Sequence, residues 1–420
     1  MGSARSLRVG VVGGSIAGCL MALELRRGGH EVTVFERSHG ELEGLLGAGL
    51  GTPTPMFQRL VDRGLVDPDL PHLALEEMAF VGLSPDGERR GHVAMSLPLI
   101  FISFHWGDLY RRLRSRVPDE IYRAGAGVAS VATVDGGAEV RVDDGSEHSF
   151  DVVVGADGYR SPIREQLFPA VELDYRGYVC WRGVRHERDM DPGELMEPTF
   201  ARFGCAGLPG SFIYPVPGAD GSIERGERLV NWGCYSPVPD GELPSFLVDR
   251  EGEPHDGTIP PGRLRPEQEE FFTALARESL PPYYADIVTS SRAIFAQAVY
   301  SVGVPDYHQG RICLIGDAGA VAPPFTGSGI FKAASNAINL TEALGADDDL
   351  DAALARWGAA EAATAASILD LGQQFDDAFI HGLPDFGAMD EATIARWWND
   401  SIEHPDGFTF EATGPGGGSR

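Results

Sequence analysis

The feature that most constrains the fold is a strand–turn–helix–strand unit close to the start of the chain. The segment "LRVGVV", residues 7–12, is an apolar run of strand type. Apolar residues then recur at helical spacing from Ile16 to Leu23, until the Gly28–Gly29 pair stops the helix. The segment "EVTVFER", residues 31–37, alternates as a second strand. The sequence therefore predicts a βαβ unit, and with it an α/β fold.

The corner between the first strand and the helix carries Gly13, Gly14 and Gly18. The first glycine allows the tight turn, and the last lets helix and strand pack closely. N–H groups at the helix start favour an anion, and Glu36 closes the second strand where a ribose hydroxyl would lie. Ser15 replaces the middle glycine of G-x-G-x-x-G, so its Cβ narrows the phosphate approach while its hydroxyl can donate a hydrogen bond. The corner favours a dinucleotide, NAD or FAD, over a plain βα turn.

Two later segments repeat the pattern of an apolar strand followed by a glycine-bearing turn. "FDVVVGADGYRSPIR", residues 150–164, turns sharply at residues 155–158. "GRICLIGDAGAVAPPFTGSGIFKAASNAINL", residues 310–340, turns at Gly316–Asp317 and again at residues 327–329, where a helix begins. The chain thus has three glycine corners, each after a buried strand.

Composition excludes several classes of partner. The net charge is −28, and Lys332 is the one lysine, so we expect no nucleic-acid partner and no anionic membrane partner. No run approaches the roughly 20 apolar residues of a membrane helix, and no secretory signal is visible, so we expect a cytoplasmic protein. The cysteines lie apart without a C-x-x-C pair, which indicates reduced core residues and no metal site: Cys19, Cys180, Cys205, Cys234 and Cys313.

In their order and spacing, the three corners resemble the fingerprints of the group A FAD-dependent aromatic monooxygenases, the para-hydroxybenzoate hydroxylase-like family. The resemblance covers residues 7–370, and "YVCWRGV", "IYPVPG" and "AIFAQAVYSVGVPDYHQGRICLIGDAG" look most like the 2,6-dihydroxypyridine hydroxylase branch. It implies a Rossmann-like, GR2-type FAD-binding domain with an inserted β-sheet substrate domain and C-terminal helices. The expected divisions are FAD-binding parts at 1–165 and 295–375, a substrate domain at 166–294, and a C-terminal helix with a flexible tail at 376–420.

The resemblance implies FAD as cofactor and NADH or NADPH as reductant. By it, the first corner cradles the pyrophosphate, Glu36 binds the adenosine ribose, and Asp317 reaches the ribityl chain. Asp157 belongs to a motif shared by FAD and pyridine-nucleotide handling. The helix start after residues 327–329 would face the flavin pyrimidine. The full implied set is Gly13, Gly14, Ser15, Ile16, Gly18, Glu36, Arg37, Trp106, Val128, Asp157, Gly158, Asp317, Pro324, Gly327, Ser328, Gly329 and Ile330.

Several positions depart from the family pattern where the cofactor is gripped. Trp106 stands in place of an arginine that contacts FAD, and Glu43 in place of another arginine. Four departures in the third motif replace histidine, glutamine, asparagine and aspartate in turn: Ala320, Ser328, Phe331 and Asn336. We expect them to alter FAD affinity or flavin mobility.

Three segments between the second and third motifs have strand-type alternation and aromatic residues: "YVCWRGV", "GSFIYPVPG" and "ERLVNWGCYSP". In the family such a sheet roofs the substrate pocket. Its candidate lining residues are Trp181, Arg182, Tyr214, Trp232 and Tyr235, each of which can equally be an ordinary sheet residue.

The chemistry implied by the resemblance is hydroxylation of an electron-rich phenol or hydroxypyridine-like ring by O2, through a flavin C4a-hydroperoxide. Such a ring needs a base or hydrogen-bond acceptor of near-neutral pKa and a dry pocket. His105 is the first candidate for the base, because it adjoins Trp106 and an unperturbed histidine has a pKa of about 6.5. Tyr214 is the second candidate, as a residue that orients a substrate hydroxyl.

Two rival interpretations remain open from the sequence. One is an FAD-dependent dehydrogenase or reductase without oxygen insertion, and the other is a non-catalytic flavin-binding protein. The expected partners are a small aromatic substrate and O2. A homodimer is a possible oligomeric state.

Overall fold

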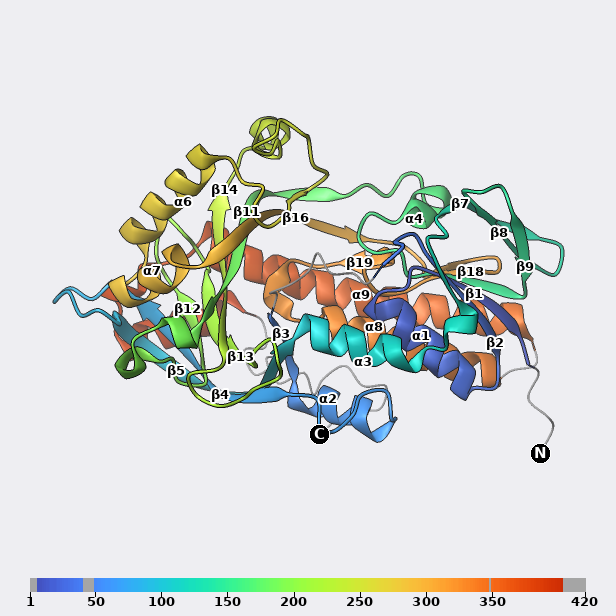
Figure 1. Ribbon diagram of the computed structural model, residues 1–420, viewed down its shortest axis with the longest axis horizontal. Coiled ribbons are helices and arrows are strands. Elements are labelled where there is room, and N and C mark those ends of the chain that lie inside the picture. Colours follow the sequence, from blue (N-terminus) through green and yellow to red (C-terminus); the bar gives the residue numbers. More distant parts are fainter. Residues whose placement is uncertain (1–5, 41–48, 347–348, 403–420) are drawn as a thin grey trace.

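The computed structural model describes residues 6–40, 49–346 and 349–402 (Figure 1). Figure 1 shows an elongated molecule with one β-sheet region at each end and long helices between them. No helix in the described ranges is long and apolar enough to cross a membrane. All five cysteines are buried and unpaired, as the sequence predicts.

The predicted βαβ unit lies in the middle of a six-stranded sheet. Five of its strands are mutually parallel and one edge strand is antiparallel. Its central strands are buried almost throughout, which is typical of parallel sheets covered on both faces. In spatial order the strands are β17 (His308–Gln309), β18 (Ile312–Leu314), β10 (Val152–Gly155), β1 (Arg8–Val12), β2 (Glu31–Glu36) and β6 (Tyr122–Ala124).

Helices and a small sheet surround this six-stranded sheet. Helix α1 (Ile16–Arg27) packs against α8 (Gly329–Ala346), which in turn packs against the long α9 (Leu350–Asp376). The neighbouring elements are α2 (Thr54–Asp62), α3 (Trp106–Arg116), α4 (Pro162–Leu167) and the three-stranded sheet of β7 (Val128–Val134), β8 (Gly137–Val142) and β9 (Glu147–Phe150).

The second large sheet has ten strands and mixes segments from distant parts of the chain. Its spatial order is β15 (Thr258–Ile259), β16 (Arg292–Gly303), β11 (Asp174–His186), β14 (Leu229–Pro237), β13 (Phe212–Val216), β12 (Thr199–Phe203), β4 (His72–Gly82), β5 (His92–His105) and β3 (Gly49–Pro53), with β19 (Ala320–Val321) paired to β16. Helices α5 (Leu243–Phe246), α6 (Pro266–Ser279) and α7 (Pro282–Thr289) lie near its strands (Figure 1).

The strands between residues 49 and 105 belong to this ten-stranded sheet, whereas the sequence interpretation grouped them with the FAD-binding part. These strands join the ten-stranded sheet because β4 pairs in parallel with β12, a strand from the middle of the chain. The domain boundaries themselves stay a prediction. The C-terminal helix is α10 (Glu391–Ser401), and the predicted flexible tail lies largely beyond residue 402, outside the described residues.

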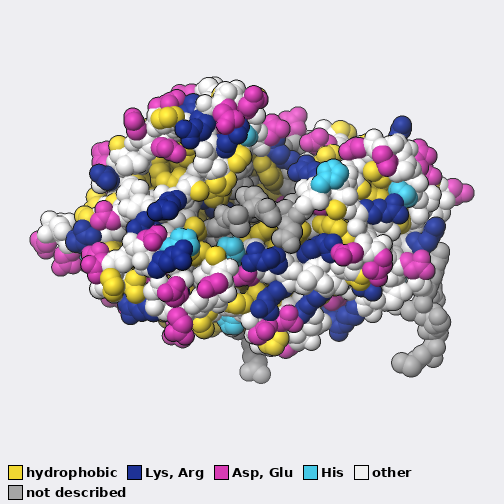
Figure 2. All heavy atoms as spheres, in the orientation of Figure 1, with side chains coloured by type: hydrophobic (Ala, Val, Ile, Leu, Met, Phe, Trp, Pro, Cys, Tyr) yellow, Lys and Arg dark blue, Asp and Glu magenta, His cyan; other side chains and the backbone are white. Residues whose placement is uncertain are grey.

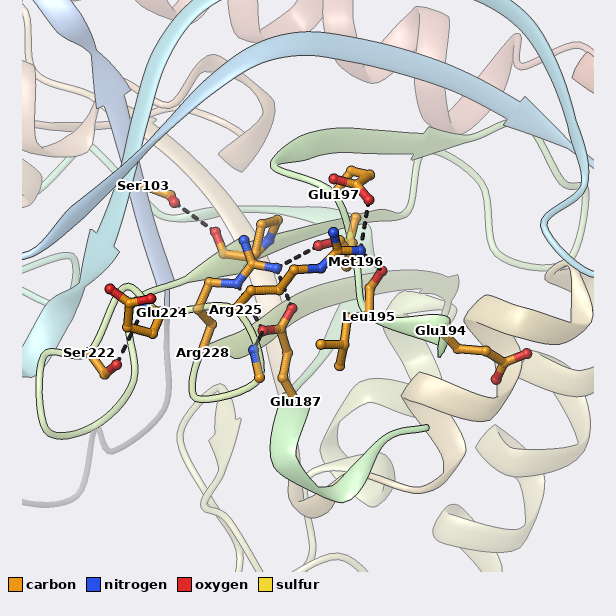
Figure 3. Close-up of polar contacts among 12 residues, drawn as sticks. Ser103, Glu187, Glu194, Leu195, Met196, Glu197, Ser222, Glu224, Arg225 and Arg228 are labelled. Carbon is orange, nitrogen blue, oxygen red and sulfur yellow. Dashed lines mark hydrogen bonds and ion pairs between the residues drawn. The ribbon is translucent and has the colours of Figure 1, made fainter. Parts of the chain in front are cut away.

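A buried ion pair joins the end of β11 to the start of β14 (Figure 3). Arg228 donates from Nε and Nη2 to the two carboxylate oxygens of Glu187, at 2.8 and 2.6 Å. The same Nη2 donates to the Met196 carbonyl at 2.6 Å, and the backbone N–H of Gly226 donates to Glu187 at 2.8 Å. Every oxygen of this buried carboxylate is therefore satisfied.

Candidate active site

A cavity of about 470 Å³ lies where the two large sheets meet. Its wall includes Ser15 from the first corner, Gly158 from the second, and Asp317 and Gly327 from the third, together with the inner face of the ten-stranded sheet. Figure 2 shows that the face of the molecule turned to the viewer is hollowed near its middle, with hydrophobic side chains around the hollow. The three glycine corners therefore converge on one space.

Steric contacts require glycine at two places in the first corner. Gly13 has a φ of +103°, and a Cβ there would lie 2.3 Å from the carbonyl oxygen of Ala156. A Cβ on Gly18 would lie 1.8 Å from the carbonyl oxygen of Gly13. The turn is therefore as close to its neighbours as backbone atoms allow, which is what a phosphate-cradling corner needs.

Glu36 is held at the end of β2 by the backbone of this corner. Its Oε2 accepts from the N–H of Gly14 at 2.7 Å, and its Oε1 accepts from the N–H of Ser38 at 2.9 Å. Tyr122 of β6 donates its hydroxyl to the carbonyl of Gly14 at 3.1 Å. Glu36 thus lies at the strand end expected for a ribose-binding carboxylate.

Arg164 ties the second corner to the third. Its buried guanidinium donates to the carbonyls of Tyr159 at 2.7 Å and Ala318 at 3.3 Å. Burial lowers the pKa of this guanidinium from its usual value. Asp157 accepts from the backbone N–H of Ile163 at 3.3 Å, at the start of α4, and does not line the cavity.

The hydrogen-bond partners of the Asn336 side chain explain why asparagine replaces the family's aspartate at this position. Asn336 accepts from the N–H of Gly316 at 2.9 Å and donates to Glu361 at 2.6 Å. Asn339 donates to the other oxygen of Glu361 at 2.7 Å. An ionised aspartate at position 336 has no N–H to donate, so the amide matches the buried carboxylate of α9.

We expect Asn336→Asp to lower the free energy of unfolding at pH 7.5 by about 1–3 kcal/mol, because it faces Glu361 with a second carboxylate. Burial already raises the pKa of Glu361. Protonation of Glu361 restores a donor, so the loss should shrink as the pH falls through that raised pKa. Urea unfolding with excess FAD at pH 5 to 8 measures this. Adding Glu361→Gln should restore most of the stability at pH 7.5, and a loss that does not change with pH contradicts the explanation.

The roof of the cavity presents the inner face of β11, β13 and β14. Cys180, Arg182, Tyr214 and Tyr235 line the space. Burial raises the pKa of Tyr214 to about 12 and that of Tyr235 well above the usual value. Both tyrosines are therefore neutral near pH 7 and can donate or accept hydrogen bonds, but do not act as bases there.

Arg202 of β12 is a buried cation on the cavity wall that the sequence interpretation missed. Its Cζ lies 5.3, 5.6 and 4.3 Å from the ring centroids of Phe200, Phe325 and Phe379. Its Nη1 donates to the carbonyl of Gly210 at 3.4 Å, and its Nε has no partner. No carboxylate among the described residues pairs with it. Burial accordingly lowers its pKa to about 10.

Two of the predicted pocket residues lie on the other face of the sheet, which corrects the prediction. Trp181 and Trp232 stack on Phe272 of α6, with centroid distances of 4.7 and 5.6 Å. Successive side chains of a strand point to opposite faces, so Trp181 and Arg182 cannot both face the cavity. Arg182 lines the cavity, and the tryptophans belong to the core behind it.

His105 does not line the cavity, which corrects its assignment as the base. The ring lies at the start of α3, where Nδ1 accepts from the N–H of Gly107 at 3.2 Å. Burial lowers the pKa of His105, opposed by Asp108 and reinforced by Arg111. Its neighbour Trp106 faces the cavity instead. The ring therefore caps a helix that borders the site.

The other predicted cofactor residues divide into two groups. Six of them do not line the cavity: Gly13, Gly14 and Gly18 of the first corner, Glu36 that contacts this corner, Arg37 directly after β2, and Val128 at the start of β7. The predicted residues on the wall are Ser15, Ile16, Trp106, Gly158, Asp317, Pro324, Gly327, Ser328, Gly329 and Ile330. Lys332 also lines the cavity and was missed, although its being the one lysine was a signal in the sequence. Glu43 lies outside the described residues.

A Rossmann-type sheet whose corners meet a roofing β-sheet at one cavity is the arrangement that the resemblance predicts for the FAD-dependent aromatic monooxygenases. Residues 262–352 match a family described as FAD binding domain, and residues 175–301 match an FAD binding domain-like family. The chain belongs to the family of FAD-dependent aromatic monooxygenases, which confirms the predicted family, fold and enzyme class.

Membership rests on similarity to the 2,6-dihydroxypyridine 3-monooxygenase of Paenarthrobacter nicotinovorans, which is 30% identical over 362 residues, 83% of this chain and 86% of that protein. The solved 2,6-dihydroxypyridine-3-hydroxylase from Arthrobacter nicotinovorans superposes with a TM-score of 0.80 at 25% identity, covering 95% of this chain and 97% of that chain. Klebsiella pneumoniae HpxO, solved with FAD and uric acid, shares the fold with a TM-score of 0.70 at 18% identity, covering 94% and 92%.

Proposed function

We propose that this enzyme uses FAD, with NADH or NADPH as reductant, to hydroxylate an electron-rich aromatic or heteroaromatic compound that binds as an anion. The observation that carries the substrate class is Arg202, a buried cation facing the cavity without a carboxylate partner among the described residues. Burying an unpaired charge is costly, so such a group calls for a negatively charged partner from the ligand.

The residues present fit FAD. The first corner is tight enough that added Cβ atoms would fill it, and the N–H groups that open α1 have no acceptor within the helix. Asp317 projects into the cavity with its side chain about half exposed. We infer that the first corner and Glu36 hold the ADP half, and that Asp317 and residues 327–329 hold the flavin half. Bound FAD supplies the electrons from the nicotinamide and activates O2 for transfer of one oxygen atom to the ring.

The roof residues do the work of orienting and activating the substrate. Arg202 stabilises a negative charge on a ring oxygen, which raises the electron density of the ring without a dedicated base. Among the described residues of the wall no histidine occurs, and Asp317 is the one carboxylate. Tyr214 and Tyr235, both neutral, provide hydroxyl groups to orient ring substituents.

Apolar side chains keep water from the place where oxygen is transferred. Phe101, Phe200, Phe212 and Phe325 line the cavity beside the tyrosines. Excluding water strengthens the interaction of Arg202 with an anion and suppresses wasteful release of hydrogen peroxide.

Stoichiometry tests this function directly. The FAD-loaded enzyme is supplied with NADH or NADPH and a panel of hydroxypyridines, phenols and neutral methoxy analogues, while the hydroxylated product and hydrogen peroxide are measured per nucleotide consumed. We expect one product for each nucleotide with an acidic ring compound. Nucleotide oxidation without ring hydroxylation would favour the reductase alternative, and a flavin that neither nucleotide bleaches would favour the non-catalytic one.

Arg202→Met tests the substrate class. We expect it to weaken binding of the anionic substrate by roughly 10- to 150-fold, the equivalent of about 1.5–3 kcal/mol for a hydrogen bond to a charged group. Its thermal stability should stay unchanged or rise, because an unpaired buried charge is removed. Perturbation of the flavin absorbance measures binding. Arg202→Lys keeps the charge, and Arg185→Met, a half-exposed arginine of the same sheet, is the control. Equal affinities of Arg202→Met and wild type would contradict an anionic substrate.

A further inference from the structure

The single lysine of the chain is buried beside the cavity. Lys332 lies in the first turn of α8, and only 5% of its side chain is exposed. Apart from the histidines, the remaining basic side chains of this strongly acidic protein are arginines. A cation in the first turn opposes the positive end of the helix dipole, at a cost of about 0.3–1 kcal/mol. Helix stability therefore does not account for a lysine at this position.

The contacts of Lys332 tie three cavity-forming segments together. Its Nζ donates to Oδ1 of Asp317 at 2.9 Å and to the carbonyl of Ala320. Asp317 belongs to the turn that follows β18, and Ala320 begins β19. Both side chains line the cavity, but the side chain of Asp317 is 51% exposed and reaches into it, whereas that of Lys332 is almost fully buried in the wall.

The surroundings give this ammonium group two effects on the cavity. It holds the Asp317 carboxylate in one orientation, toward the cavity. Its positive charge also adds to that of the α8 start, where Gly327 and Ser328 line the same wall. A cation near a redox group favours the form that carries more negative charge.

We propose that Lys332 is a positioning residue for FAD, which orients Asp317 toward the flavin half of the cofactor and raises the flavin midpoint potential. This inference rests on the proposed function, because it requires that FAD occupies the cavity. It extends that function by assigning the control of cofactor affinity and potential to one ion pair.

The test compares Lys332→Met, Lys332→Gln and Lys332→Arg. We expect Lys332→Met to weaken FAD binding to the apoprotein by roughly 10- to 100-fold, as followed by quenching of flavin fluorescence. We expect the midpoint potential to fall by about 30 mV, which is a tenfold change in relative affinity for a two-electron couple. Lys332→Gln keeps a donor without the charge, so its potential should fall while its affinity stays nearer to wild type. Lys332→Arg should keep most of the potential.

A double-mutant cycle and a matched control separate this role from a merely structural one. Lys332→Met and Asp317→Asn should be non-additive in FAD affinity, because the lysine acts through the aspartate. The control is Arg176→Met, which breaks the buried pair of Arg176 Nε and Asp376, 2.8 Å apart and away from the cavity wall. It should lower stability without changing FAD affinity or potential.

The outcomes also separate this proposal from the proposed function. Wild-type enzyme that binds FAD and hydroxylates a ring, together with Lys332 variants of unchanged affinity and potential, would overturn the role of Lys332 alone. A wild-type chain that takes up no FAD would overturn both. If Lys332→Met does not fold, the potential of Lys332→Gln decides, and a value equal to wild type refutes the proposal.

Discussion

Replacing Glu187 by glutamine, or Arg228 by methionine, is expected to lower the free energy of unfolding by about 3–5 kcal/mol, because each change leaves the other charge buried without its partner. The side chains of Glu187 and Arg228 are 0% and 6% exposed. The pair is doubly hydrogen-bonded, and Arg228 also holds the Met196 carbonyl (Figure 3). The strands joined here, β11 and β14, form the roof of the cavity, so we expect the damage to reach substrate binding.

Urea unfolding of each single variant and of the Glu187→Met/Arg228→Met double variant measures this effect. The double variant should lose less than either single variant, since removing both charges ends the desolvation penalty. Arg225→Met is the control: its pair with Glu197, 2.8 Å apart, is 52% and 62% exposed, and an exposed pair contributes about 0–1 kcal/mol. Equal losses in Arg225→Met and Arg228→Met would show that burial does not set the value of this pair.

The corners of the FAD-binding part could be predicted because their causes are local. Position 13 requires a glycine because the backbone there has a φ of +103°. Gly18 lies in the first turn of the helix that follows this corner, so its spacing from Gly13 is set by that helix. Glu36 ends a strand whose alternation is visible in the sequence. Such features depend on residues within one βαβ unit, so the sequence alone indicates them.

The substrate side of the site could be predicted only in part, because its causes are long-range. Residues near 181 and 232 were correctly placed on strands, but which face meets the cavity depends on the packing of α6. Arg202 stands in an ordinary strand segment beside Phe200, and its other two aromatic neighbours, Phe325 and Phe379, are distant in the sequence and reach it only through the fold. No sequence pattern near Arg202 indicates that its guanidinium has no carboxylate partner among the described residues.

The residues Asn336 and His105 show the same dependence on distant partners or local packing. Asn336 departs from the family aspartate, and its reason, Glu361, lies one helix further along the chain. His105 was interpreted as a base from its type and its neighbour, whereas its ring is occupied in capping α3. In both cases the partner decides the role, and the partner is known only from the structure.

We expect Gly18→Ala to reduce FAD affinity by more than about 100-fold. The new Cβ would lie 1.8 Å from the carbonyl oxygen of Gly13 and 2.9 Å from its carbonyl carbon, both backbone atoms that cannot rotate away. Overpacking costs about 1–3 kcal/mol where side chains adjust, and here the corner itself must shift. The shift would displace the N–H groups that we assign to the pyrophosphate. Titration of the apoprotein with FAD measures the affinity, and unfolding in urea measures the stability.

Gly345→Ala is the matched control for this clash, because both glycines lie within helices and a Cβ at 345 meets nothing within 4 Å. Alanine is the better helix former by about 1 kcal/mol, so the control variant should be as stable as wild type or more stable, with unchanged FAD affinity. The same gain applies at position 18, and any loss there therefore comes from the contact with Gly13. A Gly18→Ala protein that binds FAD as tightly as Gly345→Ala would show that the first corner does not hold the cofactor's phosphates.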